Sequence, residues 1–449
     1  MPNEIVVGID LGSTFIRAAV GKQDSEGNIE ILSIAKVPSM GHVHNGEIFN
    51  IHKTASALSE VLKKATSTVN GKSQDVYYVT NITGPHIQVR NFSVNQNREN
   101  PSEPVAAEEI IQLGARANNS ISDSNNHLLH AIPLGFKVDQ GKDTLDPVGS
   151  IGSLIQGDYL FVTADKDKYD TLKRTNFSSD LKSIKGGNTV FSLLATEKAV
   201  ITEEEKTAGV ALVDLGSGTS EIGVYQNNRL RNSKVISWGG DQITEDISIG
   251  LNISLDHAEA IKTKFGTSLS KEIDLKEVVL IPGIAGRKPT PVSVKNLSII
   301  IEERVRELAA AIFVEISKVT DPDALKGGIV LVGGGAQLPD IAESIQKMTG
   351  IECRIGEPTE RANSLSLEEE MNNPEYASTL GLVKLYFEQI DITNSMPVIE
   401  EKQEPSFPGA PTSTPQPKQP EKQKVDLRKF LNRVVEVVMG NDEEIPDKY

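Results

Sequence analysis

The sequence contains very little cysteine: Cys353 is the single one among 449 residues. One cysteine cannot form a disulfide within the chain. The opening residues, MPNEIVVGID, read as a strand and lack the basic start of a secretory signal peptide. These two absences predict a protein of the reducing cytosol.

Long apolar runs and positive charge are also scarce. The longest apolar stretches, such as LAAAIFVEI at 308–316, are interrupted by charge well short of the ~20 residues that a membrane-spanning helix needs. The 46 Lys and Arg residues are outnumbered by 62 Asp and Glu, which gives a formal net charge of −16. A surface of this sign repels nucleic acid and anionic lipid. We therefore expect no nucleic-acid partner, no crossing of the bilayer, and only local contact with any membrane.

The length predicts several domains, because 449 residues are too many for one core and should form two to four units. Between about 81 and 165, short strands surround one helical stretch at 106–117. This change of pattern predicts a small inserted α+β unit.

A short sequence motif occurs twice along the chain. GIDLGST occupies 8–14 and LVDLGSGTSEIG occupies 212–223, each with an apolar strand before the glycines and another after them. Glycine lets a backbone approach a ligand closely, and serine and threonine hydroxyls add donors, so such a turn suits a phosphate chain. Two facing turns could hold one polyphosphate from both sides. A third apolar strand, GIVLVGGG, runs into glycines at 328–335.

An aspartate precedes each turn, Asp10 in the first and Asp214 in the second. A carboxylate alone would repel phosphate, but Mg²⁺ resolves the conflict because it keeps several waters and is held by carboxylates together with phosphates. We therefore expect two copies of one half-domain to close on a single nucleotide. Asp, Gly and Ser also mark ordinary β-turns; the repetition in matching strand context favours the nucleotide.

The last part of the chain differs from the rest. Residues 397–424 hold many prolines and no apolar periodicity, which is typical of an extended, disordered linker. After it an apolar helical stripe returns, and its members are Leu427, Phe430, Leu431, Val434, Val435 and Val438.

The motifs stand in an order that resembles the superfamily of actin, the heat-shock chaperones and the sugar kinases. That order is the first turn at 8–14, ATEKAV at 195–200, the second turn at 214–219, AEAIK at 258–262 and GIVLVGGGAQLP at 328–339. AEAIK lies in an expected helix that Ser254 can cap at the amino end and Gly266 at the carboxyl end.

Two further segments resemble one family within it, FtsA, the bacterial actin-like cell-division proteins. HLLHAIPLGFKVDQGKDTLDPVGSIGSLIQGDYLFVTA at 127–164 is similar to the inserted subdomain of that family, and EYASTLGLVKL at 375–385 is similar to its closing helix. A proline-rich linker that ends in an amphipathic helix is also how the family finishes. The resemblance covers about 1–390 by motif, and the tail by architecture.

The resemblance implies an α/β fold with duplicated actin-like (ribonuclease H-like) ATPase halves around a nucleotide cleft, plus an inserted small α+β subdomain. The implied division is subdomain 1A at 1–83, the inserted subdomain 1C at 84–165, the first part of 2A at 166–228, 2B at 229–305, the rest of 2A with the closing helix of 1A at 306–396, the linker at 397–424, a membrane-targeting helix at 425–440 and an acidic tail at 441–449.

The resemblance also implies roles at the nucleotide. Glu259 and Lys262 would contact the ribose and base, and the glycines at 333–335 would close over the adenosine. The residues expected to bind ATP are Asp10, Gly12, Ser13, Thr14, Arg17, Asp214, Gly216, Ser217, Gly218, Thr219, Gly240, Glu259, Lys262, Gly333, Gly334 and Gly335, and Asp10 and Asp214 would hold Mg²⁺ through water. Two alternatives stay open: an exposed Glu259–Lys262 pair that aids solubility, and an Arg17 on a solvated strand face.

The chain departs from the family at two points. Ser217 stands where the family usually has glycine, which narrows the turn without removing Gly216 and Gly218. Ser192 stands where polymerising relatives place an acidic residue, so no general base is evident there. We assign no catalytic residue and expect at most slow ATP hydrolysis.

The implied function is an ATP-binding cell-division protein that polymerises on the cytoplasmic membrane at the division site and anchors the FtsZ ring there. Its implied partners are the FtsZ C-terminal tail, further copies of itself, membrane lipids and later division proteins. The alternatives are a sugar or metabolite kinase, which needs a catalytic Asp in the cleft, and a pilus-assembly ATPase, which the terminal helix argues against. A chaperone would need a substrate-binding domain downstream of 397.

The apolar stripe within 425–440 is expected at the inner face of the membrane, because the linker before it supplies no core to cover it. Residues 426–439 carry a net charge of +1, so hydrophobic burial must dominate the attachment. A helix that docks on a protein partner is the alternative, since valines are mediocre helix formers and the acidic end, NDEEIPDKY, opposes anionic lipid.

Overall fold

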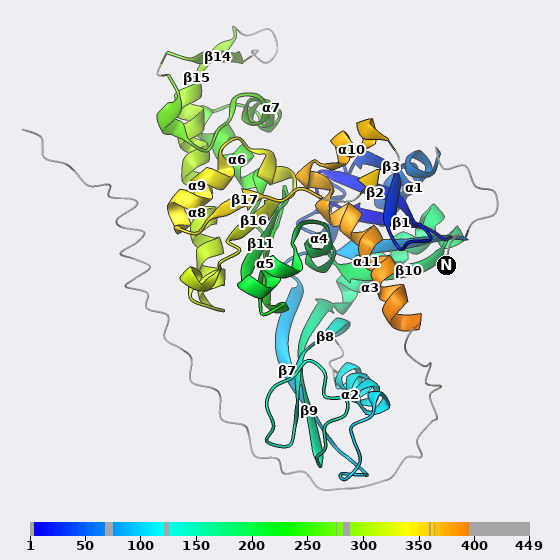
Figure 1. The fold of residues 1–449 in the computed structure, drawn as a ribbon. Helices are drawn as coiled ribbons and strands as arrows, with labels where there is room; N and C mark the ends of the chain where they lie inside the picture. The colour runs from blue at the N-terminus through cyan, green and yellow to red at the C-terminus, as the bar shows by residue number, and fades with distance from the viewer. Residues whose placement is uncertain are drawn as a thin grey trace, which may run out of the picture. The chain divides into compact units, whose positions relative to one another are not determined.

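A computed structural model describes residues 4–67, 75–120, 125–274, 276–281, 288–358, 361–362 and 364–394 (Figure 1). The chain divides into two units, Met1–Tyr386 and Phe387–Tyr449, and nearly all described residues belong to the first. The predicted linker, terminal helix and acidic tail lie outside the described residues. None of the described helices combines the length and the hydropathy that crossing a membrane requires.

The first unit contains two sheets built on one plan. The first sheet has the order β10-β6-β1-β2-β3-β18, with β1 at Glu4–Leu11, β2 at Phe15–Gln23, β3 at Ile29–Pro38, β6 at Asp75–Ile82, β10 at Lys185–Phe191 and β18 at Arg361–Ala362. The second has the order β13-β12-β11-β16-β17, with β11 at Val210–Leu215, β12 at Ser220–Gln226, β13 at Arg229–Ile236, β16 at Ile329–Val332 and β17 at Cys353–Ile355.

The pairing within the two sheets is the same. In each, three consecutive strands are antiparallel, and two later strands continue parallel to the first of the three. The two-residue strand β18 is added at one edge of the first sheet. The duplication predicted from the repeated motif is thus present in the order and direction of the strands and in the position of the turns.

Helices flank the strands in both halves. Those of the first half are α1 at Ile51–Thr66, α3 at Lys166–Ser178, α4 at Ser192–Val200, α10 at Leu365–Met371 and α11 at Ala377–Asn394. Those of the second are α5 at Glu203–Ala208, α6 at Gly240–Leu251, α7 at Leu255–Phe265, α8 at Val294–Ser317 and α9 at Ile341–Thr349. Two small hairpins complete the framework, β4 at Val43–His44 with β5 at Glu47–Ile48, and β14 at Val278–Ile281 with β15 at Thr290–Ser293.

Local sequence signals explain several of these elements. Ser254 caps α7 by accepting a hydrogen bond from the backbone N–H of His257, and Gly266 ends it; both caps were predicted. Strand β1 is an almost continuous apolar run because both of its faces are buried. Helix α11 crosses it at Gly8, where a Cβ would lie 2.7 Å from the Thr379 carbonyl oxygen.

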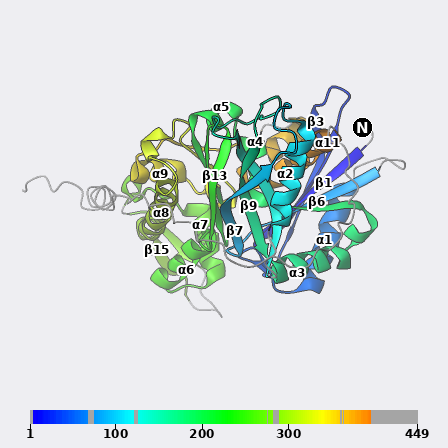
Figure 2. The ribbon, with the colours of Figure 1, turned by 90° about the horizontal axis from the view of Figure 1, so that it is seen from below.

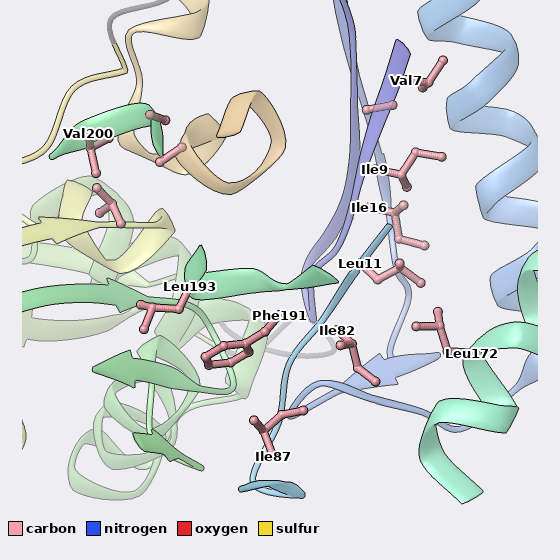
Figure 3. Packing of buried hydrophobic residues seen from close by; sticks show 14 of the residues in the cluster. Val7, Ile9, Leu11, Ile16, Ile82, Ile87, Leu172, Phe191, Leu193 and Val200 are labelled. Carbon is pink, nitrogen blue, oxygen red and sulfur yellow. The ribbon is translucent and has the colours of Figure 1, made fainter. Parts of the chain in front are cut away.

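The core of the first half lies between its sheet and the helices α1 and α3. Figure 3 shows Ile9 and Ile16 from the sheet facing α1, with Leu172 of α3 beside them. These side chains are buried. Burial of such aliphatic side chains fixes the sheet edge from which the repeated turns project.

The inserted unit has its own sheet and core. Strands β7 at Ile87–Asn97, β9 at Leu154–Asp165 and β8 at Asn126–Val138 form an antiparallel sheet in that order, with α2 at Ala107–Asn119 beside it (Figure 1). The buried side chains that unite them are Val105, Leu113, Ala117, Phe136, Ile155, Tyr159 and Phe161. The predicted α+β insertion is therefore present, while the exact boundaries of the proposed division stay a prediction.

Two polar contacts tie the inserted unit to both halves. His130 of β8 accepts a hydrogen bond at Nε2 from the Phe191 backbone N–H, 3.0 Å away, where β10 meets α4. Arg229 of β13 forms an ion pair with Asp143, with 3.0 Å between Nη1 and Oδ2. Burial lowers the pKa of His130 to about 4, so its imidazole is neutral and can accept this hydrogen bond.

Candidate functional site

A cavity of about 420 Å³ opens at the ends of the two repeated hairpins. Every residue predicted to bind the nucleotide lines this one cavity, and the set is Asp10, Gly12, Ser13, Thr14, Arg17, Asp214, Gly216, Ser217, Gly218, Thr219, Gly240, Glu259, Lys262, Gly333, Gly334 and Gly335. The two copies of the motif therefore face the same cavity. The roles assigned to the individual residues stay predictions.

The two turns lie against each other at the cavity. A Cβ at Gly218 would sit 3.0 Å from the Ser13 hydroxyl oxygen and 2.5 Å from Oδ1 of Asn45. The second turn is closed by the Gly216 backbone N–H, which donates to the Thr219 carbonyl oxygen at 2.9 Å. The first is held by the Ser39 hydroxyl, which donates to the Ser13 carbonyl oxygen. Any side chain at 218 would force the turns apart.

The third glycine segment forms one wall of the cavity. Gly333 has a φ of +85°, and a Cβ there would lie 2.3 Å from Oδ1 of Asp214, so the position needs glycine. A Cβ at Gly334 would meet no atom within 4 Å. A larger side chain at 334 would therefore occupy open space at the cavity without disturbing the backbone.

Three carboxyl groups line the cavity, those of Asp10, Asp214 and Glu221; Asp10 and Glu221 are buried and Asp214 is partly buried. Asp10 accepts a hydrogen bond from Nδ2 of Asn81 at 2.5 Å, and Asp214 accepts a weaker one from the Thr196 hydroxyl at 3.3 Å. Burial raises the pKa of Asp10, although Arg17 and Asn81 oppose the shift. Burial and then the charge of Asp10 raise the pKa of Asp214 to about 7.

Glu221 is the third of these carboxyls. Its pKa rises well above its ordinary value, first because of burial and next because of the charge of Asp214. Its Oε2 atom is buried and has no hydrogen-bond partner in the described structure. A cation would relieve this repulsion. The described residues contain no group of three or more His, Cys, Asp or Glu side chains placed to hold a metal ion. The role of Asp10 and Asp214 in holding Mg²⁺ through water stays a prediction.

Arg17 is buried, which rules out the alternative of a solvated strand face. Its Nη1 lies 3.6 Å from Oδ2 of Asp10, and its Nη2 lies 2.6 Å from Oε2 of Glu375. Lys36 also pairs with Glu375, at 2.9 Å. Burial would raise the pKa of Glu375, but the charges of Arg17 and Lys36 outweigh it and lower that pKa. Arg17 is thus fixed beside the cavity by two carboxylates.

Lys262 is likewise largely buried, so the pair with Glu259 is more than a solubilising surface pair. The Lys262 ammonium lies 2.6 Å from Oε2 of Glu259 and donates to the Gly240 carbonyl oxygen at 3.0 Å and to the Thr244 hydroxyl at 2.8 Å. These contacts hold the Lys262 head at the wall of the cavity opposite the carboxyls of the first half. Glu259 stays half exposed and accepts a hydrogen bond from Thr244.

Several cavity residues escaped the sequence analysis, notably Asn81, Glu221, Glu375 and Ser378. One signal existed for Glu221, because it stands seven positions after Asp214 just as Arg17 stands seven after Asp10, and each is the direct strand partner of its aspartate. Ser192, where no acid was found, lies 3.0 Å from the Ser378 hydroxyl. The nearby carboxyl comes instead from Glu221 on β12.

Two family models match the chain. The model described as Cell division protein FtsA matches residues 211–381, and the one described as the SHS2 domain inserted in FTSA matches residues 84–163. The second range overlaps the sheet of β7, β8 and β9 together with α2.

Curated relatives named Cell division protein FtsA match over most of their length. The Escherichia coli K12 protein is 28% identical over 392 residues, which cover 85% of this chain and 90% of that protein. The Pseudomonas aeruginosa PAO1 protein is 25% identical over 443 residues and covers 98% of both chains. The Neisseria meningitidis MC58 protein is 29% identical over 377 residues, 84% of this chain and 88% of its own.

Solved structures confirm the fold. The chain is similar to one in the PilM-PilN type IV pilus biogenesis complex, with a TM-score of 0.57 and 16% identity over 85% of this chain and 98% of that one. It is also similar to MreB 5 of Spiroplasma citri bound to AMPPNP, with a TM-score of 0.50 and 13% identity over 88% and 99%. These likenesses concern the fold alone, and they agree with the predicted duplicated actin-like architecture.

The raised pKa of Asp214 predicts that this residue makes the ligand-free protein less stable as the pH rises, against the opposite contribution of the buried His130. At a pH below the ordinary pKa of an aspartate, Asp214 is protonated in both the folded and the unfolded protein. Between that pH and about 7, the unfolded protein releases this proton while the folded protein keeps it, so unfolding becomes easier. We expect Asp214→Asn to flatten this fall and to unfold at a higher temperature than the wild type near pH 8, by roughly 2–4 °C per kcal/mol of relief.

Thermal melts near pH 5 and pH 8, without metal or nucleotide, check this prediction. Glu204→Gln is the matched control, because Glu204 is an exposed carboxylate on α5. If the melting temperature of Asp214→Asn changes between pH 5 and pH 8 by the same amount as that of the wild type, or if the variant melts below the wild type at pH 8, the prediction is wrong.

Proposed function

Because the chain belongs to the FtsA family of bacterial actin-like cell-division proteins, we propose that it binds ATP with Mg²⁺ between its two halves, polymerises on the cytoplasmic membrane and anchors the FtsZ ring there. The proposal starts from membership in a family of cell-division proteins and from the actin-like fold. It adds the binding of ATP, attachment to the membrane, formation of a filament and contact with FtsZ.

The observation that carries the ATP proposal is the meeting of both glycine turns at one cavity. Turns of this kind present backbone N–H groups to phosphate, and two of them enclose a polyphosphate chain. AMPPNP, bound by the similar MreB 5 structure, is an ATP analogue with such a chain. The glycines at 333–335 leave room above Gly334 for the nucleoside.

Different residues contact different parts of the nucleotide. The turns at 12–14 and 216–219 donate to the phosphates, and Lys262 with Glu259 contacts the ribose and base. Asp10 and Asp214 hold Mg²⁺ through its waters. The ion supplies positive charge that neutralises the phosphates, and it relieves the repulsion that raises the pKa of Asp214 and Glu221. Arg17 stays with Asp10 and Glu375.

The nucleotide acts chiefly as a structural ligand that favours the closed, polymer-competent state. Glu221 is an acidic residue at the cavity, but burial and then the charge of Asp214 raise its pKa well above the ordinary value, which makes it a poor general base. Hydrolysis is therefore slow.

The partners follow from the proposed division. The inserted subdomain 84–165 carries filament and later-partner contacts, because the cavity residues lie outside it; subdomain 2B, at 229–305, carries the surface for the FtsZ tail. The helix at 425–440 binds the membrane, and the match of the Pseudomonas relative over 98% of this chain supports a tail shared with that relative. The protein thus sits peripherally on the cytoplasmic face of the inner membrane at the division site.

The kinase and pilus-assembly alternatives have less support. The FtsA models match both the insertion and the second half, whereas the pilus-complex structure shares the fold at 16% identity. A kinase would need a carboxylate free to activate an alcohol, but Asp10 is committed to Asn81 and Arg17.

Two substitutions test the ATP site. Asp214→Ala should lower affinity for ATP in Mg²⁺ by about 10–100-fold, the range seen when a group that orients a bound metal is lost, with a much smaller effect when the metal is chelated. Gly334→Leu should block the nucleoside space while the fold is kept, because its Cβ meets no protein atom. Calorimetric titration of the wild type and both variants measures this.

The control for Gly334→Leu is Gly114→Ala on α2. A Cβ at position 114 would lie 3.9 Å from its nearest atom, and this position is distant in sequence from both glycine turns. It should bind ATP like the wild type. Equal affinity in the wild type and Asp214→Ala proteins would overturn the assignment of the site.

Slow turnover is tested by phosphate release from the ATP-bound protein. We expect rates far below the ~1–100 per second of kinases, since burial and the charge of Asp214 disfavour the ionised form of Glu221 that a general base needs. Rates within that range would refute the structural role of the nucleotide.

The membrane proposal is tested at Val435, which lies in the apolar stripe of 425–440. Val435→Glu places a charge on the face that would enter the lipid, so co-sedimentation of ATP-bound filaments with liposomes should be lost. Filament formation raises apparent affinity by multivalency, and the wild type should therefore sediment better with ATP than without. If the variant keeps its liposome binding but loses a protein partner, the helix docks on protein and the membrane proposal is wrong.

A further inference from the structure

A second hollow lies on the first half, where α1, α3 and β6 meet; Figure 2 shows α1 and α3 side by side. It has a volume of about 670 Å³ and shares no lining residue with the cavity described above. Its lining includes Ile51, Tyr78, Arg174, Asn176, Phe177 and Lys182, and we call it the α3 groove.

The α3 groove is basic in a protein with a net charge of −16. Lys173 lines it and donates to the Gly187 carbonyl oxygen at 2.9 Å. Arg174 and Lys182 are exposed and form no ion pair with any carboxylate of the described structure. Asp170 stands one helical turn before Arg174, yet no ion pair joins them. The groove therefore presents two cations without acidic partners.

A buried polar group points to a ligand here. Asn176 is almost fully buried and lines the groove, and its Oδ1 atom has no hydrogen-bond partner in the described structure. Its Nδ2 donates to the Thr80 hydroxyl at 3.3 Å. Because that hydroxyl can also donate, the amide can turn over and present its N–H groups to an anion. A buried amide oxygen without a partner is unfavourable, and a polar ligand would satisfy the amide.

Helix α1 begins at the groove and adds to its positive potential. Ile51 and His52, its first two residues, line the groove, and its first turn contains no acidic residue. The Asn50 side chain accepts a hydrogen bond from the Lys53 backbone N–H. The N–H groups of Ile51 and His52 precede it, and such first N–H groups lack intrahelical partners and favour an anion. Three independent features thus favour a negatively charged ligand: the cations, the amide and the helix end.

The ligand must also carry an apolar part. Phe177, at the end of α3, is 74% exposed, and Ile51 and Tyr78 line the groove beside it. An exposed aromatic ring next to basic side chains is typical of surfaces that lie in the headgroup layer of a membrane. A soluble phosphate compound or an acidic peptide would not need a ring projecting into solvent.

We propose that the α3 groove binds the phosphate of an anionic phospholipid, with Phe177 in the boundary between headgroups and acyl chains. The inference rests on the proposed attachment to the membrane. A second contact is needed there because the segment at 426–439 carries a net charge of only +1 and is followed by the acidic residues of 441–449, and lasting attachment usually takes two signals. The groove supplies the charge that the helix lacks and fixes which face of the first half meets the lipid.

Full-length protein with Arg174→Glu and Lys182→Glu tests the proposal by co-sedimentation with two kinds of vesicle. Each basic residue near an anionic surface contributes ~1 kcal/mol, so we expect affinity for phosphatidylglycerol-containing vesicles to fall by about tenfold or more. Affinity for pure phosphatidylcholine vesicles should stay unchanged, because there the apolar helix acts alone. The matched control is Lys234→Glu with Lys271→Glu, which makes an equal charge change at two exposed lysines away from the groove. This control should lose far less affinity for phosphatidylglycerol-containing vesicles.

A second measurement reports insertion directly. The chain has one tryptophan, Trp238, so the pair Trp238→Phe and Phe177→Trp gives a single fluorophore at position 177. Its emission should shift to shorter wavelength with phosphatidylglycerol vesicles, and the shift should disappear when Arg174→Glu and Lys182→Glu are added.

The outcomes separate this proposal from the one on which it rests. If Val435→Glu abolishes vesicle binding while the groove variants bind like the wild type, the helix anchors the protein and the groove proposal is wrong. If emission from position 177 does not shift with vesicles, or if the control pair loses as much affinity as the groove pair, the groove proposal is also overturned. If the wild type binds neither kind of vesicle, both proposals fall.

Discussion

The site depends on one electrostatic constraint: the carboxyl groups of Asp10, which is buried, and of Asp214, which is partly buried, lie at the ends of equivalent strands and face one cavity. Asp10 has Asn81 and Arg17 to offset its charge. Asp214 has a single weak hydrogen bond from Thr196, and the charge of Asp10 raises its pKa further. Bringing the halves together without a cation is therefore costly, and the protein spends stability to keep the site ready for one.

The duplication of the halves is exact in topology but not in charge. The residue opposite Asp10 in the antiparallel pair is Arg17, and the residue opposite Asp214 is Glu221. The first half thus contains its own counter-charge, fixed further by Glu375, while the second half adds a further acid. A ligand that brings positive charge interacts more strongly with the second half. This difference explains how a symmetric fold can present an asymmetric site with a defined polarity for the nucleotide.

The sequence predicted those features that depend on local pattern. The repeated glycine turns, the capped helix α7 and the inserted unit all follow from spacing within a few residues. It did not reveal Asn81 or Glu375, which reach the cavity from positions distant in the chain because parallel strand pairing and helix packing bring them there. The groove beside α3 was invisible for the same reason, since Ile51, Tyr78 and Asn176 share no motif and meet only in the folded chain.

The inserted unit is placed where it must respond to any change between the halves. His130 holds it to the backbone of Phe191, the residue just before Ser192 in the cavity, and Arg229 of the second half holds it through Asp143. These two contacts belong to different halves, so a rotation of one half relative to the other cannot preserve both with their present geometry. Packed cores do not stretch continuously, and one contact has to break or the unit has to turn. A ligand that sets the angle between the halves therefore also sets the position of the inserted sheet.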